Sequence, residues 1–152
     1  MGSYMEKSKN LLAEINPDNE KVFISGSISI KSLDQQAIDF LDSIMANGQT
    51  VLIGDAFGVD KLVQQYLFEY NYQSVTVYYS GDKVRNNIGN WQTKQIINDN
   101  NLTGKSMYQQ KDIIMAQDAD CGLMIWDSKS QGTKFNIDNM TKLGKEIFIV
   151  TD

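Results

Sequence analysis

The sequence predicts a doubly wound α/β protein, with a five-stranded, mainly parallel sheet covered by helices on both faces. Apolar runs of strand length alternate with segments of helical periodicity, and parallel strands need helical crossovers between them. Three of the apolar runs end in a turn of Gly, Ser and Asp just before a helical pattern, at 22–27, 52–60 and 123–133. A strand order of 3-2-1-4-5 would bring the turns at Gly26 and Gly132 together at the switch point of the sheet.

The first half of the chain contains three predicted strands and two predicted helices. The strands are expected at 21–25, 50–53 and 75–79. The first helix is expected at 33–46, because Ser32-Leu33-Asp34-Gln35 has the spacing of a capping box and Asn47-Gly48 supplies a stop. The second helix starts at Gly58, and its apolar face carries Val59, Leu62, Val63, Tyr66, Leu67 and Tyr70.

The second half of the chain begins with a long polar segment. Residues 80–104 are rich in Asn and Gly and exceed the length of an ordinary connection, so we predict a functional loop with one short helix near 93–98. A helix at 106–117 and a strand at 121–126 follow. A helix at 133–143, ended by Gly144, and a strand at 146–150 complete the pattern.

Charge and composition exclude several classes of function. The chain has 152 residues and a formal net charge of −5, which argues against broad electrostatic binding to nucleic acid or to an anionic membrane. We therefore expect no nucleic-acid partner and no membrane partner, with room only for a local basic patch. The single cysteine, Cys121, cannot form an internal disulfide, and no segment resembles a signal peptide or a membrane span. A cytoplasmic location is the resulting expectation.

The chain contains no histidine, and this excludes several catalytic mechanisms and metal sites. Without imidazole there is no Ser/His or Cys/His nucleophile pair, and no cysteine cluster offers zinc spacing in its place. We expect no metal and no cofactor. Acid or base chemistry would fall to carboxylates, tyrosines, lysines or bound water.

The three turns are suited to holding phosphate. The start of a helix has unpaired N–H groups and partial positive charge, and glycine lets a ligand approach the backbone. The candidate ligand-binding residues in the turns are Gly26, Ser27, Gly54, Asp55, Gly58, Asp127, Ser130, Gly132 and Thr133. The alternative interpretation is a set of ordinary strand-to-helix turns, with Asp60 as a partner of its own helix dipole.

The long loop adds three more candidates. Arg85 can bind phosphate through two parallel hydrogen bonds, Asn87 offers further donors, and Trp91 can stack on a base. The alternative is a surface loop whose Trp91 docks on the core. Lys111 and Asp112 could point into the same crevice or form a solvated pair.

Together the motifs resemble those of the SLOG superfamily of Rossmann-like nucleotide-binding proteins. This group includes the DNA-processing protein A fold and the cytokinin-activating phosphoribohydrolases. The resemblance rests on Gly26-Ser27, on 54–60 in place of a Gly-Gly-Ala-x-Gly-x-Asp loop, and on 127–133 before the fourth helix. In the phosphoribohydrolases a Gly-Gly-x-Gly-Thr-x-x-Glu pattern supplies a catalytic glutamate, whereas the aligned residue here is Asn136. An amide cannot replace that carboxylate in cleaving an N-glycosidic bond.

The resemblance covers 21–150 and sets the expected domain organisation and function. Residues 1–20 are interpreted as an N-terminal tag remnant and extension, and residues 21–152 as one Rossmann-like nucleotide-binding domain. The resemblance implies a nucleotide-like ligand and allows a homo-oligomer. We expect a binding or sensing module for a nucleotide or nucleotide-sugar derivative, such as a nucleoside phosphate or an ADP-ribose-like compound, at the carboxyl ends of the strands.

Two other functions stay open at this point. The first is an N-glycosidase, nucleoside-phosphate hydrolase or glycosyl-transfer enzyme, with Asp55, Asp60, Asp112 and Asp127 as candidate catalytic carboxylates. The second is DNA binding by analogy with DNA-processing protein A, which the acidic balance of the chain disfavours.

Overall fold

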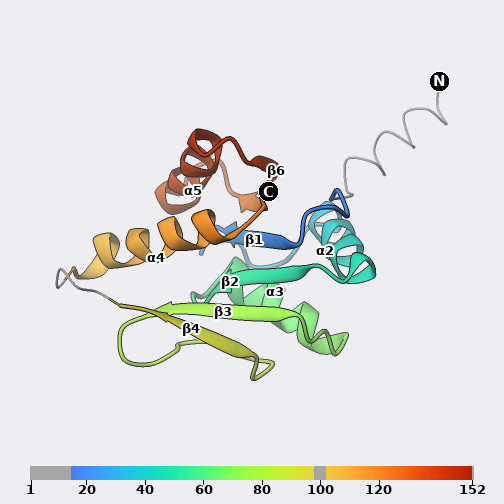
Figure 1. The fold of residues 1–152 in the computed structure, drawn as a ribbon, viewed down its shortest axis with the longest axis horizontal. Coiled ribbons are helices and arrows are strands. Elements are labelled where there is room, and N and C mark those ends of the chain that lie inside the picture. Colours follow the sequence, from blue (N-terminus) through green and yellow to red (C-terminus); the bar gives the residue numbers. More distant parts are fainter. Residues whose placement is uncertain (1–14, 98–101, 152) are drawn as a thin grey trace.

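The computed structural model describes residues 15–97 and 102–151, which form a six-stranded, fully parallel sheet with helices on both faces (Figure 1). The strands are β1 (Lys21–Gly26), β2 (Thr50–Gly54), β3 (Val75–Ser80), β4 (Gln92–Ile96), β5 (Cys121–Trp126) and β6 (Glu146–Thr151). The helices are α2 (Gln35–Asn47), α3 (Val59–Glu69), α4 (Gly104–Asp118) and α5 (Gln131–Lys142). The order across the sheet is β4-β3-β2-β1-β5-β6.

The doubly wound α/β fold is confirmed, with one strand more than expected. The five predicted strands lie in the predicted order, and β4 is added at the edge beside β3. The short helix expected near 93–98 is wrong, because residues 92–96 pair in parallel with β3 and residue 98 lies outside the described residues. Only Ile96 of β4 is buried. An edge strand with only one buried side chain lacks the apolar run from which a strand is predicted.

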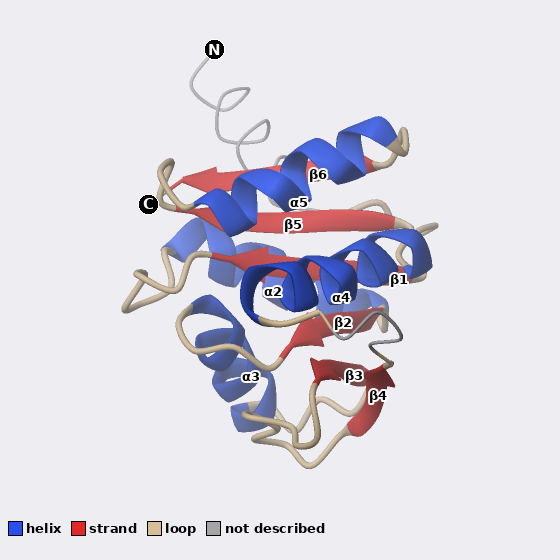
Figure 2. Cartoon of the chain, turned by 90° about the vertical axis from the view of Figure 1, so that its left-hand side faces the viewer, coloured by secondary structure: helices blue, strands red, loops and turns tan. Residues whose placement is uncertain are grey.

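The two faces of the sheet hold separate apolar clusters. On one face Phe40 of α2 and Val63 of α3 pack with Ile24 of β1. On the other face Met115 of α4 and Met140 of α5 pack with Phe23, the preceding residue of β1. Figure 2 shows α4 and α5 together in front of the sheet. Successive residues of β1 thus point to opposite covered faces, as in a buried parallel strand.

The helix ends differ slightly from the predicted ones. The N-cap of α2 is Asp34 and not Ser32, and the Asp34 carboxylate accepts a hydrogen bond of 2.7 Å from the N–H of Gln36. Gly48 ends this helix in the left-handed conformation at φ 68°, as predicted. Ser130 is the N-cap of α5, so that helix begins two residues earlier than expected. Within the described ranges, no helix combines the length and apolarity needed to cross a membrane.

Residues just before β1 pack against the domain. Ile15 is 1% exposed and lies in the cluster of the α2–α3 face. The side-chain amide of Gln49 donates hydrogen bonds to the carbonyl oxygens of Asn16 and Asn19, at 3.0 and 2.7 Å. Part of the predicted extension therefore contributes to the core, and the rest of it, residues 1–14, lies outside the described residues.

Candidate functional site

A cavity of about 560 Å³ lies at the carboxyl ends of β1, β2 and β5, walled by α4 and α5. The structure brings most of the predicted site residues to it: Gly26, Ser27, Gly54, Asp60, Arg85, Asp112, Asp127, Ser130, Gly132 and Thr133. Asp55, Gly58, Asn87 and Trp91 are not among its lining residues. The cavity lies at the switch point of the sheet, where β1 pairs with β2 on one side and with β5 on the other.

Three hydroxyl groups converge at the start of α5. Ser27 Oγ lies 2.7 Å from Ser130 Oγ, and Ser130 Oγ donates to Thr133 Oγ1 at 3.2 Å. The first turn of α5 adds N–H groups that have no partner within the helix. A Cβ built on Gly132 meets no atom within 4 Å, so the backbone there faces open space. This corner of the cavity has the donors and the access that an anion needs.

Asp127 organises the turn that leads into α5. Its carboxylate accepts hydrogen bonds from Ser29 Oγ at 2.6 Å and from the N–H groups of Ser130 and Lys129 at 2.7 and 2.8 Å. These donors, Ser29 first, hold the pKa of Asp127 far below its usual range. Asp127 is therefore an ionised carboxylate that shapes its own turn and, through Ser29, ties that turn to the loop after β1.

A buried amide lies at the base of the same corner. Asn136 Nδ2 donates to Ser25 Oγ at 2.7 Å, and Asn136 is only 2% exposed. Among the described residues, Asn136 Oδ1 has no hydrogen-bond partner, and Asn136 lines the cavity. A buried polar atom without a partner costs about 1–3 kcal/mol, so this end of the amide is suited to a group on a ligand.

The opposite wall carries a buried cation between carboxylates. Lys111 Nζ lies 3.2 Å from Asp112 Oδ1, and Lys111 is 5% exposed. Burial lowers the pKa of Lys111, but Asp112 and Asp60 outweigh it and leave that pKa raised. Burial raises the pKa of the Asp60 carboxyl to about 6, even though the Lys111 ammonium acts in the opposite direction. The cavity thus contains a carboxyl whose pKa lies close to neutral pH.

Two of the motif glycines are explained by close packing. A Cβ on Gly26 would stand 2.5 Å from Val59 Cβ, so this glycine lets the start of α3 approach the end of β1. A Cβ on Gly54 would stand 2.5 Å from Lys111 Nζ and 2.7 Å from Asp60 Oδ2. Gly54 therefore makes room for the Lys111 and Asp60 side chains in the cavity wall.

Arg85 reaches the rim of the cavity and is fixed there by Asp55. The fully buried Asp55 carboxylate accepts hydrogen bonds from Arg85 Nη2 at 2.7 Å and from the Arg85 N–H at 2.8 Å. Burial lowers the pKa of the guanidinium, but the hydrogen bond and charge of Asp55 leave it raised. The guanidinium also lies 4.5 Å from the centre of the Tyr108 ring. Asp55 therefore positions Arg85 and does not face the cavity itself.

The remaining candidates lie elsewhere. Trp91 is 7% exposed, packs in the core and donates from Nε1 to the carbonyl of Tyr72 at 2.8 Å. The Asn87 amide binds both the N–H and the carbonyl of Trp91, each at 2.9 Å. Gly58, at φ 72°, has the backbone of Ile28 where a Cβ would stand. These three residues stabilise the loops. For Trp91 this agrees with the alternative interpretation from the sequence, a ring that docks on the core.

Tyr108 and Ser25 are among the cavity-lining residues that sequence reasoning did not propose. Tyr108 precedes Lys111 and Asp112 by three and four residues, which is the spacing of one helix face, so this triplet carried a usable signal. Ser25 comes at the end of a continuous apolar run, and nothing in the sequence marked it as a site residue. Among the described residues, no group of three or more His, Cys, Asp or Glu side chains could hold a metal ion.

No protein-family model and no curated protein matches the sequence. Comparison with solved structures finds DNA processing protein A from Helicobacter pylori, a structure described for its mode of single-stranded DNA binding. The match has a TM-score of 0.67 and 18% sequence identity, and covers 90% of this chain and 67% of that chain. The chain therefore shares the fold of DNA processing protein A, which is the part of the expected resemblance that the comparison confirms.

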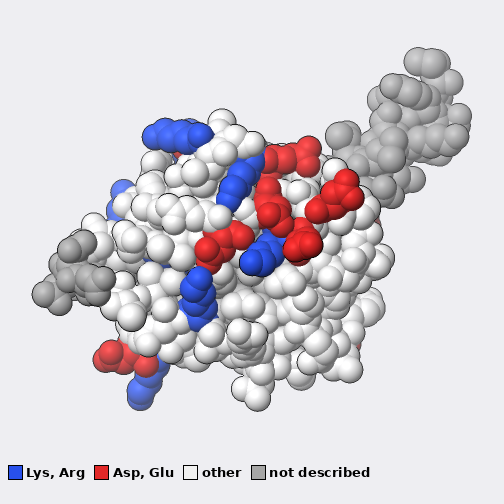
Figure 3. All heavy atoms as spheres, viewed as in Figure 1, with Lys and Arg blue, Asp and Glu red and all other residues white. Residues whose placement is uncertain are grey.

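The same match corrects one expectation. We expected no nucleic-acid partner from the net charge, and this exclusion is wrong, because a protein with the same fold binds single-stranded DNA. Net charge averages over the whole surface, whereas binding depends on the charge at one place. Figure 3 shows basic and acidic side chains interspersed on one face of the molecule. The value of −5 consequently says little about any single patch.

Proposed function

We propose that the cavity binds a nucleoside phosphate, supplied either as a free nucleotide or as one unit of a single DNA strand. The observation that carries the proposal is the convergence of the hydroxyls of Ser27, Ser130 and Thr133 on the first turn of α5, beside the open space at Gly132. The phosphate would bind there. Membership of the SLOG superfamily, inferred from the three motifs, is part of this proposal.

The rest of the cavity can accommodate the nucleoside. Its volume of about 560 Å³ falls within the usual range of about 300–1,000 Å³ for small-molecule sites. The unpartnered oxygen of Asn136 can accept a hydrogen bond from a sugar hydroxyl next to the phosphate. The Arg85 guanidinium, stacked on Tyr108, offers a planar surface and a positive charge at the rim. A nucleotide-sugar such as an ADP-ribose-like compound is a further member of the ligand class.

A titration panel tests the proposal. Calorimetry and thermal-shift measurements would compare dTMP, AMP, ADP-ribose, the corresponding nucleosides and inorganic phosphate. We expect the nucleotides to bind and to raise Tm by mass action, and the nucleosides to bind much more weakly. The control is Gly132→Asp, which places a carboxylate in the phosphate corner. Absence of nucleotide binding at millimolar concentration, or equal binding by Gly132→Asp, would overturn the proposal.

One observation favours a second candidate function, an N-glycosidase or related glycosyl-transfer enzyme. Asp60 and Asp112 both line the cavity, and a carboxyl with a pKa of about 6 is suited to proton transfer near neutral pH. Asp55 and Asp127 are weaker candidates, since their carboxylates are engaged with Arg85 and with the turn before α5. Chromatography of nucleoside monophosphates incubated with the protein separates the two functions. Release of free base that disappears in Asp60→Asn would establish the enzymatic function. Absence of release would support the function as a binding module.

A further inference from the structure

We propose that a groove beside the start of α3 binds a short acidic segment of a partner protein, which inserts one apolar side chain and sets its carboxylates against two lysines. The residues that carry this proposal line one hollow of the surface, which we call the docking groove: Ile28, Ile30, Lys31, Phe57, Lys61 and Leu62. Of the described residues, only Ile28 lines both the docking groove and the nucleotide cavity, so the proposal goes beyond the function proposed above.

The docking groove combines a buried apolar base with an exposed apolar rim. Its volume is about 410 Å³. Ile30 is 3% exposed, and Leu62 packs against the apolar cluster of the α2–α3 face. In contrast, Ile28 is 65% exposed and Phe57 is 55% exposed. Exposed apolar side chains that gather in one hollow with polar neighbours mark an interaction site, whereas scattered ones do not.

The backbone holds the exposed apolar side chains in place. A Cβ on Gly58, at φ 72°, would stand 2.4 Å from Ile28 Cα, so the loops after β1 and β2 are in direct contact. The N–H groups of Val59 and Ile30 both donate to the carbonyl oxygen of Ser27, at 3.3 and 3.4 Å. A partner that binds here therefore has little loop motion to arrest, and this lowers the entropic cost of association.

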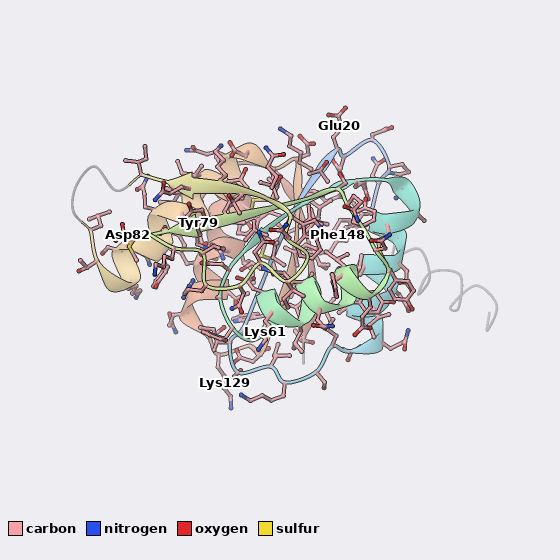
Figure 4. All side chains as sticks on the ribbon, turned by 90° about the horizontal axis from the view of Figure 1, so that it is seen from below. Glu20, Lys61, Tyr79, Asp82, Lys129 and Phe148 are labelled. Atoms are coloured by element: carbon pink, nitrogen blue, oxygen red, sulfur yellow. The ribbon has the colours of Figure 1, made fainter. Side chains whose placement is uncertain are left out.

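The charge of the docking groove calls for carboxylates on the partner. Lys31 and Lys61 are exposed, and neither forms an ion pair within residues 15–97 and 102–151. No Asp or Glu is among the described residues that line the groove, and Asp60 lines the nucleotide cavity instead. Figure 4 shows Lys61 on α3, with Lys129 extending outward on the same side of the molecule. An acidic chain thus presents uncompensated positive charge at this place, which attracts and orients an acidic partner.

The shape and chemistry of the docking groove favour an acidic segment over other occupants. A purely apolar partner would cover two lysines without compensating them. Nucleic-acid bases stack on flat aromatic or guanidinium faces, whereas Ile28, Ile30 and Leu62 are branched aliphatic side chains. The small volume of the groove suits one inserted side chain and its flanking backbone. A segment with Asp or Glu on both sides of a Leu, Ile, Val or Phe uses the apolar base and both lysines together.

A random library of short displayed peptides identifies the chemistry that the full chain selects. We expect enrichment of sequences that combine Asp or Glu with one large apolar residue. The tightest peptide would then be labelled and titrated by fluorescence anisotropy. Its analogue with Asn and Gln in place of Asp and Glu should bind about tenfold more weakly, and so should its analogue with Ser in place of the apolar residue.

Substitution of Phe57 locates the binding site. Phe57→Ala should weaken binding of the labelled peptide about tenfold, because a large apolar anchor dominates the affinity of a small interface. The side chain is more than half exposed, so the variant should fold, and circular dichroism checks this. The matched control is Phe68→Ala, since Phe68 is 51% exposed at the other end of α3.

A second variant tests the charge. In Lys31→Gln/Lys61→Gln the affinity for the peptide at low salt should fall about fivefold, because two exposed ion pairs are lost. Added salt should also weaken binding less than it does in wild type, since screening acts on those pairs. Lys142→Gln, in the last turn of α5, is the control and should behave as wild type does.

Several outcomes would overturn the proposal. Enrichment of neutral or basic peptides, or no enrichment at all, would do so, as would a peptide that Phe57→Ala binds as tightly as wild type does. If an oligothymidylate displaces the peptide from Gly132→Asp, the docking groove belongs to nucleic acid. If the free protein sediments as a dimer and Phe57→Ala as a monomer, the groove belongs to a second copy of this chain.

The test also separates this proposal from the proposed function. Gly132→Asp should retain the affinity for the peptide while it loses dTMP, because Gly132 does not line the docking groove. Peptide binding without any dTMP binding to wild type would refute the nucleotide site alone. Binding of dTMP with no enrichment of acidic peptides would refute the docking groove alone.

Discussion

Lys111 Nζ lies 2.5 Å from the point where a Cβ on Gly54 would stand, and Asp60 Oδ2 lies 2.7 Å from the same point. The glycine at the end of β2 thus leaves the space that a buried ammonium and a buried carboxyl group occupy from two sides. Its presence follows from the charged wall of the cavity and does not require a ligand in contact with the Gly54 backbone.

Gly54→Ala should therefore destabilise the fold. The added methyl group would collide with both Lys111 Nζ and Asp60 Oδ2 within a packed wall, and overpacking of this kind costs about 1–3 kcal/mol. Urea denaturation would measure the change in the free energy of unfolding. Gly132→Ala is the control, because a Cβ there meets no atom within 4 Å. Equal stability of the two variants would contradict the packing role of Gly54.

Asp60 should make stability depend on pH. Burial raises its pKa from 3.8 to about 6, so the folded state holds this proton more tightly than the unfolded state does. The stabilisation is fully present below about pH 4 and is lost as the pH rises through about 6, with a total of at most about 3 kcal/mol. The measurement is the free energy of unfolding of wild type minus that of Asp60→Asn, between pH 4 and pH 7. This difference should fall with rising pH, and a constant difference would contradict the assignment.

Arg85→Ala should disturb the fold as well as any ligand binding. The substitution leaves the fully buried Asp55 without its counter-charge, and removing one partner of a buried pair costs about 3–5 kcal/mol. Because the Arg85 side chain is 33% exposed, we expect about 2–3 kcal/mol by chemical denaturation. The double variant Arg85→Ala/Asp55→Asn should recover part of the loss. A double variant less stable than Arg85→Ala would show that the pair is not the cause.

Substitutions of Gly132 test the proposed phosphate site at the start of α5 directly. Gly132→Asp should weaken nucleotide binding about tenfold or more, because a charge-assisted hydrogen bond is worth about 1.5–3 kcal/mol and the new carboxylate repels the anion. Gly132→Asn has nearly the same size without the charge and should retain more of the affinity. Calorimetry with dTMP compares the two variants, and circular dichroism checks that both are folded. Equal affinities for the two would mean that size and not charge governs this corner.

The sheet could be predicted wherever a strand is buried on both faces. β1 and β5 are continuous apolar runs, because each is covered by helices on two sides, and such runs stand out in the sequence. β4 escaped prediction, since backbone pairing with β3 stabilises it and its side chains are mostly exposed. Hydrogen bonds between strands leave no trace in the pattern of side chains.

The candidate site could be predicted in part for a related reason. Ser130 and Gly132 were found because a turn before a helix has a characteristic composition, and that composition fixes where the residues lie relative to the strand end. Trp91 was ambiguous, because residue type does not reveal whether a ring turns toward the core or toward a cleft. Lys111 and Asp112 were also ambiguous, since the face of α4 that meets the cavity depends on how that helix crosses the sheet.

The hydrogen bonds that close the cavity join distant parts of the chain. The contact between Asn136 and Ser25 spans 111 residues, and that between Ser27 and Ser130 spans 103. During synthesis on the ribosome, β1 and β2 therefore emerge long before the α5 residues that complete the site. Contacts of such long range form slowly and only once the intervening elements are in place. A ligand that needs both Ser27 and Ser130 consequently recognises only molecules in which α5 has docked, and its binding can serve as a reporter of complete folding.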